Sequence, residues 1–418
     1  MIDNAFIQFF DELKNILNRF FKLGYTRFSV PKKEISDRDE AYQLACQIYK
    51  RGFISFLDKN EKKSHDEISF LNTSNFIIKL NSQKKDELFL IIDKNFLTLH
   101  EDFNDAIKNF NFIIFESQES NKTLETVFDL MQKIQPKVQT IYAIGGGIIL
   151  DLVGFTCKLL NKEVVYVPTT ILAAVDACIG GKTSVNYLPY GKNQIGFFSQ
   201  PKEILFVPQF FETLPFHEKI SGLGEALKHS WIFGTFLEDF YIFEKIYTET
   251  ASLDDFKSLI LKNIKYKTFI TQEDPLELTS FRSILNFGHT FAHFLESICI
   301  QSKNYSIPHG IAVLYGIQFL LSANLINWPK SISNYKYLIN SICKNFSIPI
   351  HKKITVHDIE FYLNQDKKNS HSHEITLILP EYGILNEKND KSQVTNCIKR
   401  YSTNAVAFQM LEFMKSFE

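Results

Sequence analysis

The sequence of 418 residues lacks a strong net charge, a paired cysteine pattern and a long uninterrupted apolar run. Its 46 basic and 47 acidic residues leave a formal net charge of -1, which excludes the basic footprint of a nucleic-acid-binding protein. The six cysteines show neither metal-ligand spacing nor the density of a disulfide scaffold, so we expect reduced thiols. The most apolar stretch, Gly310 to Ile326, is interrupted by polar residues and predicts a buried helix rather than a membrane span. With no signal or transit pattern at the start, we expect a cytoplasmic protein without a nucleic-acid or membrane partner.

The length and the hydrophobic pattern predict two main domains. Residues 1–72 are charged and mixed and read as an N-terminal extension. Short apolar runs alternate with helical stretches over 73–212, which predicts an α/β domain with a Rossmann-like parallel sheet. Residues 213–418 are dominated by the 3.6-residue period of helices, so a mostly α-helical domain follows.

A glycine triplet, Gly145 to Gly147, stands between an apolar strand and a helix that begins near Ile148. Without side chains there, a phosphate can approach the backbone N–H groups at the positive end of that helix. The spacing is not that of the usual dinucleotide motif, so a simple tight turn remains open. Asp93 and Asn95 end an earlier strand, where α/β sheets usually bind ligands, although an ordinary turn explains them equally well.

One carboxylate and three histidines occupy helical positions that suit a metal centre. Glu225 and Lys228 are three residues apart and share a helical face, where an exposed ion pair is the commoner arrangement. His289 and His293 are four apart on another helix, and His309 follows a proline at the start of a third. A carboxylate with two histidines suits Zn²⁺ with one position open for substrate, but spacing alone leaves their convergence open.

The stretch KTSVNYLPYGK, from Lys182 to Lys192, is polar and follows a glycine pair, so we predict a loop that binds an anion. Arg282 carries a planar guanidinium fork that suits two-point contact with a carboxylate or phosphate. Most of the other lysines need no explanation beyond exposure to solvent.

Taken together, several blocks resemble 3-dehydroquinate synthase and, more widely, the sugar phosphate cyclases. The resemblance covers about residues 88 to 380 and rests on IGGGIILDLVGF, VPTTILAAVDACIGGKTSVNYLPYGKNQIGFFSQP, FETLPFHEKISGLGEALKH, FRSILNFGHTFAHFLES, HGIAV and DKKN. It implies a dehydroquinate synthase-like fold, a sugar phosphate substrate, a homodimer, NAD, and zinc, or cobalt in its place, as the metal. The implied reaction is transient oxidation by NAD, phosphate elimination, reduction, ring opening and aldol closure, without net redox change.

The resemblance also carries roles over to individual residues. The implied metal ligands are Glu225, His289 and His309. The implied NAD-binding positions are Asp93, Asn95, Glu119, Lys122, Gly146, Gly147, Asp151, Thr169, Thr170, Lys182 and Asn193. The implied catalytic positions are Lys182, Lys228, Lys267, Arg282, Asn286 and His293, and substrate contacts fall on Asp176, Lys192, Asn193 and one of Lys367 or Lys368.

The sequence departs from the family pattern where an arginine usually precedes the VPTT strand. The region reads CKLLNKEVV, and Lys162 is the nearest replacement, although a point charge cannot reproduce a guanidinium fork. The departure keeps three functions open: dehydroquinate synthesis, a related cyclase acting on another sugar phosphate, and a non-catalytic scaffold. A metal-dependent dehydrogenase of the glycerol type is a further alternative, which would accumulate NADH.

Overall fold

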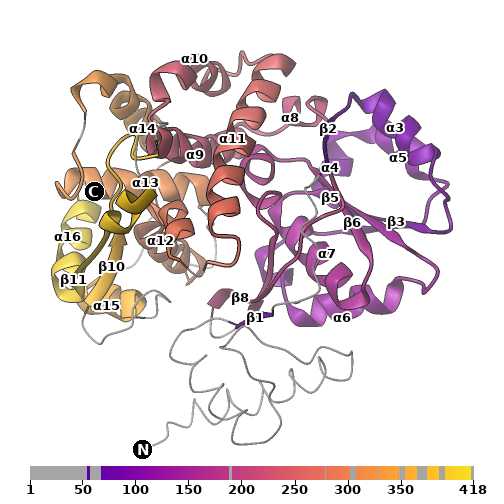
Figure 1. Ribbon diagram of the computed structural model, residues 1–418, viewed down its shortest axis with the longest axis horizontal. Helices are drawn as coiled ribbons and strands as arrows, with labels where there is room; N and C mark the ends of the chain where they lie inside the picture. The colour runs from indigo at the N-terminus through magenta and orange to yellow at the C-terminus, as the bar shows by residue number, and fades with distance from the viewer. Residues whose placement is uncertain are drawn as a thin grey trace, which may run out of the picture. The chain divides into compact units, whose positions relative to one another are not determined.

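The computed structural model describes residues 54–56, 67–187, 191–277, 279–301, 307–327, 329–346, 348, 354–364, 374–385 and 391–415 (Figure 1). Most of the predicted extension 1–72 and both Lys367 and Lys368 lie outside the described residues. The chain divides into two compact units. The described residues of the first, here called the sheet unit, fall within Met1–Ser69, Ser74–Val167 and Gly181–Phe206, and those of the second, the helical unit, within Phe70–Thr73, Pro168–Gly180 and Val207–Glu418. In the part of the chain that is described, no helix is long and apolar enough to cross a membrane.

The sheet unit is built on six strands in the order β2-β9-β6-β5-β3-β4. The strands are β2 (Glu67–Phe70), β3 (Leu88–Asp93), β4 (Phe112–Phe115), β5 (Thr140–Gly145), β6 (Glu163–Pro168) and β9 (Glu203–Phe206). Strand β3 runs parallel to β4 and β5, and β6 runs parallel to β9. All six residues of β3 are buried, as expected for a parallel strand covered on both faces. The helices are α3 (Thr73–Asn81), α4 (Lys94–Leu99), α5 (Glu101–Ile107), α6 (Leu124–Lys133) and α7 (Gly147–Leu160).

The described residues between Lys182 and Lys192 form strands rather than the loop that the sequence predicts. Residues Lys182–Tyr187 form β7, which pairs antiparallel with β8 (Gly191–Phe198), and β1 (Ile54–Phe56) pairs parallel with β8. Thr183 faces Phe197 and Val185 faces Ile195 across the pair, and these four side chains are buried. Alternating Thr, Val and Tyr residues favour a strand with one buried face, and this pattern outweighs the polar residues between them.

The helical unit confirms the predicted mostly helical part of the fold. Its helices are α8 (Gln209–Glu212), α9 (Phe216–Phe233), α10 (Phe236–Tyr247), α11 (Leu253–Glu273), α12 (His289–Gln301), α13 (His309–Ser322), α14 (Ser333–Asn345), α15 (Val356–Asn364) and α16 (Thr403–Lys415), with a small antiparallel pair of β10 (Glu374–Ile378) and β11 (Ile398–Ser402). Residues Pro168–Gly180, which the sequence assigns to the α/β part, cluster with this unit because their π-helical turn η2 (Ala173–Ala177) packs on α9 and α11.

Helices α9 and α13 approach closely at two glycines. A Cβ placed on Gly310 would lie 1.7 Å from the carbonyl oxygen of Ser221, and one placed on Gly224 would lie 2.2 Å from the carbonyl oxygen of Gly310. The backbone N–H of Gly310 also donates to Oγ of Ser221 at 3.3 Å. Because only glycine permits this backbone contact, His309 at the start of α13 is held at a fixed place beside α9.

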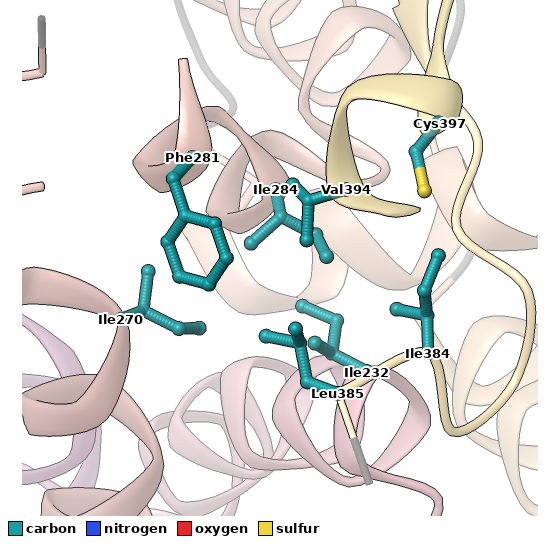
Figure 2. Packing of buried hydrophobic residues seen from close by; sticks show 8 residues of the cluster. All are labelled: Ile232, Ile270, Phe281, Ile284, Ile384, Leu385, Val394 and Cys397. Atoms are coloured by element: carbon teal, nitrogen blue, oxygen red, sulfur yellow. The ribbon is translucent and has the colours of Figure 1, made fainter. Parts of the chain in front are cut away.

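A hydrophobic cluster fixes the turn η3 (Phe281–Asn286) within the same unit (Figure 2). Figure 2 shows Phe281 and Ile284 of η3 packed with Ile232 of α9 and Ile270 of α11. Burying these side chains stabilises η3, and the two polar residues that the same turn carries, Arg282 and Asn286, therefore have a rigid support.

Candidate metal centre and active site

Three predicted metal ligands from three helices of the helical unit come together. Glu225 lies on α9, His289 begins α12 and His309 begins α13, and one ligand atom from each lies within 4.8 Å of the other two. Oε1 of Glu225 is 3.6 Å from Nε2 of His289 and 3.5 Å from Nε2 of His309. The Glu225 side chain is completely buried. A buried carboxylate facing two imidazole nitrogens is therefore present.

The distances from Oε1 of Glu225 to the two histidine nitrogens fit ligands of one shared metal ion better than they fit hydrogen bonds. Ordinary N–H···O bonds span about 2.7–3.2 Å. Two ligand atoms that are each about 2.1 Å from a tetrahedral Zn²⁺ are about 3.4 Å apart, close to what Glu225 shows with both histidines. Neither carboxylate oxygen makes a hydrogen bond of ordinary geometry with any described residue, although the ammonium of Lys228 lies against Oε2. A divalent cation would satisfy Oε1, the carboxylate oxygen that faces the two histidines.

The far sides of both imidazole rings also have contacts. Nδ1 of His289 lies 3.1 Å from the carbonyl oxygen of Phe287, and Nδ1 of His309 lies 3.4 Å from Oε1 of Glu296. Since an acceptor at Nδ1 favours the proton on that nitrogen, both Nε2 atoms are left with a lone pair for a metal.

The electrostatics of the three ligands favour a positive charge between them. Against the effect of burial, Lys228 and the two histidines hold the pKa of Glu225 well below its ordinary value. Burial, with Lys228 beside it, lowers the pKa of His289 well below its ordinary value. Although burial opposes it, the carboxylates of Glu296 and Glu225 raise the pKa of His309 to about 10. A metal ion would take the place of that proton, since metal binding and protonation compete for the same ligands.

Two predicted lysines are buried in ion pairs with carboxylates. Lys228 is 1% exposed, contacts Glu225 and donates to the carbonyl oxygen of Leu285 at 2.8 Å. Lys267 donates to Oδ1 of Asp176 at 2.7 Å and to the carbonyl oxygen of the same residue. The exposed pair that the spacing of Glu225 and Lys228 suggests is therefore not what forms. Against burial, Lys267 lowers the pKa of Asp176 to about 2, so this carboxylate stays ionised beside the lysine.

Arg282 is anchored by the backbone. Its Nη1 donates to the carbonyl oxygens of Gly180 and Pro275, each at 3.1 Å, and its Nε is 3.6 Å from Oε1 of Glu277. Gly180 has a φ of 91°, and a Cβ there would lie 2.8 Å from Nη2. Nη1 of Arg282 belongs to the guanidinium that is predicted to bind an anion, and it also holds the backbone at Gly180 through a hydrogen bond.

The remaining predicted catalytic residues of this unit lie on α12 and η3. His293 is exposed, and its ring centroid is 5.5 Å from that of His289 and 6.4 Å from that of His309. Asn286 ends η3 and is half-buried. An exposed imidazole beside the ligand histidines can exchange protons with solvent, which a buried ring cannot do readily.

Two buried polar residues near the centre have no role in the sequence interpretation. Nδ1 of His229 lies 2.8 Å from Oδ1 of Asn263, whose Nδ2 donates to the carbonyl oxygen of Leu259 at 2.8 Å. This arrangement places the His229 proton on Nδ1. Its Nε2 has no hydrogen-bond partner among the described residues, and one ligand atom of His229 lies within 4.8 Å of one from each of Glu225 and Asp176. The only sequence signal was its place one turn after Glu225.

The glycine turn of the sheet unit lies between β5 and α7, where the sequence predicts a turn. Gly146 caps α7, which has no side-chain hydrogen bond at its N-terminus. A Cβ on Gly145 would meet Ile149 at 2.6 Å and Cβ of Asp93 at 3.2 Å. Gly146 and Gly147 have no side chains, so neither residue covers the backbone N–H groups at the start of α7. Asp93 itself caps α4 by accepting from the N–H groups of Asn95 and Phe96.

Several predicted NAD and substrate contacts form one polar network in the sheet unit. The ammonium of Lys122 contacts Oδ2 of Asp151 and donates to Oδ1 of Asn193 at 2.6 Å. Asn193 has a φ of 52°, and its N–H donates to Oδ1 of Asn186 at 2.8 Å. Burial raises the pKa of Asp151, although Lys122 opposes that shift. These contacts hold the β7–β8 hairpin against α7.

The other predicted residues fall on both units. Glu119 accepts from Asn186 at 2.8 Å and lies 3.9 Å from the ammonium of Lys192. Lys182 begins β7, with its ammonium 5.8 Å from the ring centroid of Phe198. Thr169 is buried in the helical unit, and Oγ1 of Thr170 accepts from the N–H of Ala173 at 3.1 Å.

Comparison with known proteins identifies the family. Residues 112–221 match the family described as 3-dehydroquinate synthase N-terminal, and residues 222–369 match 3-dehydroquinate synthase C-terminal. A 3-dehydroquinate synthase from Clostridium tetani is 33% identical over 315 residues, which cover 72% of this chain and 80% of the relative. The chain therefore belongs to the 3-dehydroquinate synthase family.

Two solved structures share the fold at low sequence identity. A 2-deoxy-scyllo-inosose synthase complexed with carbaglucose-6-phosphate, NAD⁺ and Co²⁺ is 21% identical, with a TM-score of 0.65, and the match covers 82% of this chain and 96% of that one. The 2-epi-5-epi-valiolone synthase ValA from Streptomyces hygroscopicus, with NAD⁺ and Zn²⁺ bound, is 18% identical, with a TM-score of 0.66, and the match covers 87% and 100%.

Proposed function

We propose that this chain is an NAD- and metal-dependent sugar phosphate cyclase that makes 3-dehydroquinate from a seven-carbon acid sugar phosphate with release of phosphate. The convergence of Glu225, His289 and His309 is the observation that carries the proposal. Membership of the 3-dehydroquinate synthase family and the NAD and metal ions bound by the two cyclases of the same fold support it.

The residues of the helical unit would bind the metal ion, stabilise the departing phosphate and transfer protons. When bound, the metal ion supplies Lewis acidity toward a substrate hydroxyl, and NAD supplies reversible hydride transfer. Lys228 and Lys267 keep their ammonium groups at fixed places because each is paired with a buried or half-buried carboxylate. Fixed positive charges can stabilise a departing phosphate without reorganising during the reaction. His293, with its exposed ring beside His289, would pass protons to and from the substrate.

The sheet unit would bind the nucleotide. The open N-terminus of α7 at Gly146 and Gly147 suits a pyrophosphate. Asp151 and Asn193, both tied to Lys122, would form one wall of that site, and Asp93 would keep the first turn of α4 in place. Asn95, Glu119, Thr169, Thr170, Lys182 and Lys192 are proposed on the family resemblance.

Arg282 and His293 favour an acid sugar phosphate over a neutral one. Arg282 carries a planar guanidinium, which suits two-point contact with a carboxylate, and the carbonyl oxygens of Gly180 and Pro275 fix its place. A related cyclase acting on another sugar phosphate is the second candidate, because the usual arginine before the VPTT strand is absent.

A substrate panel would test the proposal. The full chain, NAD and Zn²⁺ or Co²⁺ would be incubated with acidic and neutral seven-carbon sugar phosphates, while phosphate release, product mass and absorbance of NADH are measured. We expect stoichiometric phosphate and a cyclic ketone from the acid substrate without NADH accumulation. Turnover of a neutral substrate only would favour the second candidate, and steady NADH growth would identify a dehydrogenase. Absence of both metal binding and turnover would favour a scaffold.

A further inference from the structure

We propose that Glu296 is a positioning residue that orients the imidazole of His309 for metal binding; this inference rests on the proposed metal centre. Glu296 lies on α12 and is 8% exposed, and its Oε1 is 3.4 Å from Nδ1 of His309. On the opposite side of the same ring, Nε2 is 3.5 Å from Oε1 of Glu225. The ring therefore lies between two carboxylates, one on the ligand side and one on the far side.

The two ligand histidines are held differently. His289 has a backbone carbonyl oxygen, that of Phe287, at its Nδ1, and its side chain is 12% exposed. The His309 side chain is 29% exposed and belongs to the first residue of α13, where the capping residue Pro308 makes no side-chain hydrogen bond. Packing therefore restrains the His309 ring less than the His289 ring. A carboxylate at Nδ1 supplies the missing restraint and makes Nε2 a stronger ligand.

Helix geometry explains how Glu296 reaches this place. Glu296 follows His289 by seven residues on the same helix, close to two full turns, so both point to one side of α12. His289 contributes a ligand nitrogen on that side, and Glu296 reaches the ring that α13 contributes. One helix thus provides one ligand and the support for another.

A simple structural ion pair is the alternative, and it predicts a different outcome. An outer partner of a ligand histidine typically changes metal affinity by 10–100-fold when it is removed. A structural pair would instead lower the stability of the metal-free protein and leave the affinity for metal unchanged. Glu296→Gln keeps the shape of the side chain and an acceptor oxygen but loses the charge, whereas Glu296→Ala removes both.

Zinc affinity would be measured by competition with a chelator for the wild-type chain, Glu296→Gln and Glu296→Ala. Glu412→Gln is the matched control, because Glu412 is an exposed glutamate whose ion pair is with the neighbouring Lys415. We expect unchanged affinity in the control, about tenfold weaker binding in Glu296→Gln and up to about 100-fold weaker binding in Glu296→Ala. The visible absorption of bound Co²⁺ should change in the Glu296 variants but not in the control.

The thermal midpoint of each metal-free protein separates folding from ligand positioning. Wild-type zinc affinity and an unchanged Co²⁺ spectrum in both Glu296 variants would overturn the assignment, whatever happens to the midpoint. A wild-type chain that binds neither metal would instead contradict the metal centre itself, and the positioning role with it. Partial recovery of affinity in Glu296→Asp relative to Glu296→Ala is expected, because the shorter carboxylate retains the charge.

Discussion

Replacing Gly310 by alanine should disrupt the metal centre without touching a ligand. The added Cβ would lie 1.7 Å from the carbonyl oxygen of Ser221, whereas real Cβ contacts are not shorter than 3.0 Å. Relief of the clash therefore needs a movement of at least about 1.3 Å between α9 and α13. Because Glu225 lies on α9 and His309 on α13, their ligand atoms would separate by a similar amount, and metal ligands tolerate only about 0.2 Å.

The assay is zinc stoichiometry after dialysis, combined with urea unfolding of the metal-free protein. Overpacking of this kind typically costs about 1–3 kcal/mol of stability. Ser322→Thr is the control, because it adds one methyl group at an exposed position of the same helix. We expect full zinc content in the control and loss of zinc in Gly310→Ala. If Gly310→Ala retained one zinc with wild-type affinity, the close approach of the two helices would not be what positions His309.

Three further predictions concern other parts of the structure. Arg282→Lys should lower the free energy of unfolding by about 1.5–3 kcal/mol for each hydrogen bond to a carbonyl oxygen that it removes, and an unchanged urea midpoint would show that the clamp on Gly180 contributes nothing. Lys122→Met should lower the free energy of unfolding by up to roughly 3–5 kcal/mol, because it leaves the partly buried Asp151 carboxylate without its ammonium partner. Lys84→Met, which removes an exposed ion pair, is the control and should leave the urea midpoint at its wild-type value. Burial first, and then Lys228, lower the pKa of His229 to about 4, so the folded chain keeps this ring neutral. The neutral His229 ring should contribute its full stabilisation above about pH 6.5. The free energy of unfolding should then fall by on the order of 3 kcal/mol as the pH decreases toward 4. Urea midpoints of the zinc-free wild type and His229→Gln across this range should diverge, and parallel curves would contradict the shift.

The fold and the candidate ligand set could be predicted from the sequence because both leave strong local patterns. Alternating strands and helices define the sheet unit, and His289, His309 and Glu225 each stand at a recognisable helical position. Their convergence could not be derived from spacing, since it depends on the contact of α9 with α13 at Gly224 and Gly310, which no local pattern records.

The predicted loop from Lys182 to Lys192 shows where local reasoning fails. Two lysines and a glycine pair suggested a loop, but the alternate residues Thr183 and Val185 find a buried face against β8. The glycine pair is required for another reason, because Gly180 and Gly181 have φ values of 91° and 66°. Tertiary packing decided the secondary structure of this stretch.

Buried polar pairs were equally hard to foresee. Glu225 and Lys228 look like an exposed helical pair by spacing alone, yet both are almost fully buried. Glu296 and His229 carry no motif, and they become visible only when the neighbours of the ligand residues are known. The five cysteines among the described residues are buried, and none of them forms a disulfide bond with another.

X-ray absorption at the zinc edge of the loaded, full-length protein tests the central claim most directly. One carboxylate oxygen and two imidazole nitrogens at about 2.0–2.2 Å are predicted, with the imidazole signal reduced by half in His309→Ala. A first coordination sphere without imidazole, or one that His309→Ala leaves unchanged, would contradict the metal centre formed by Glu225, His289 and His309.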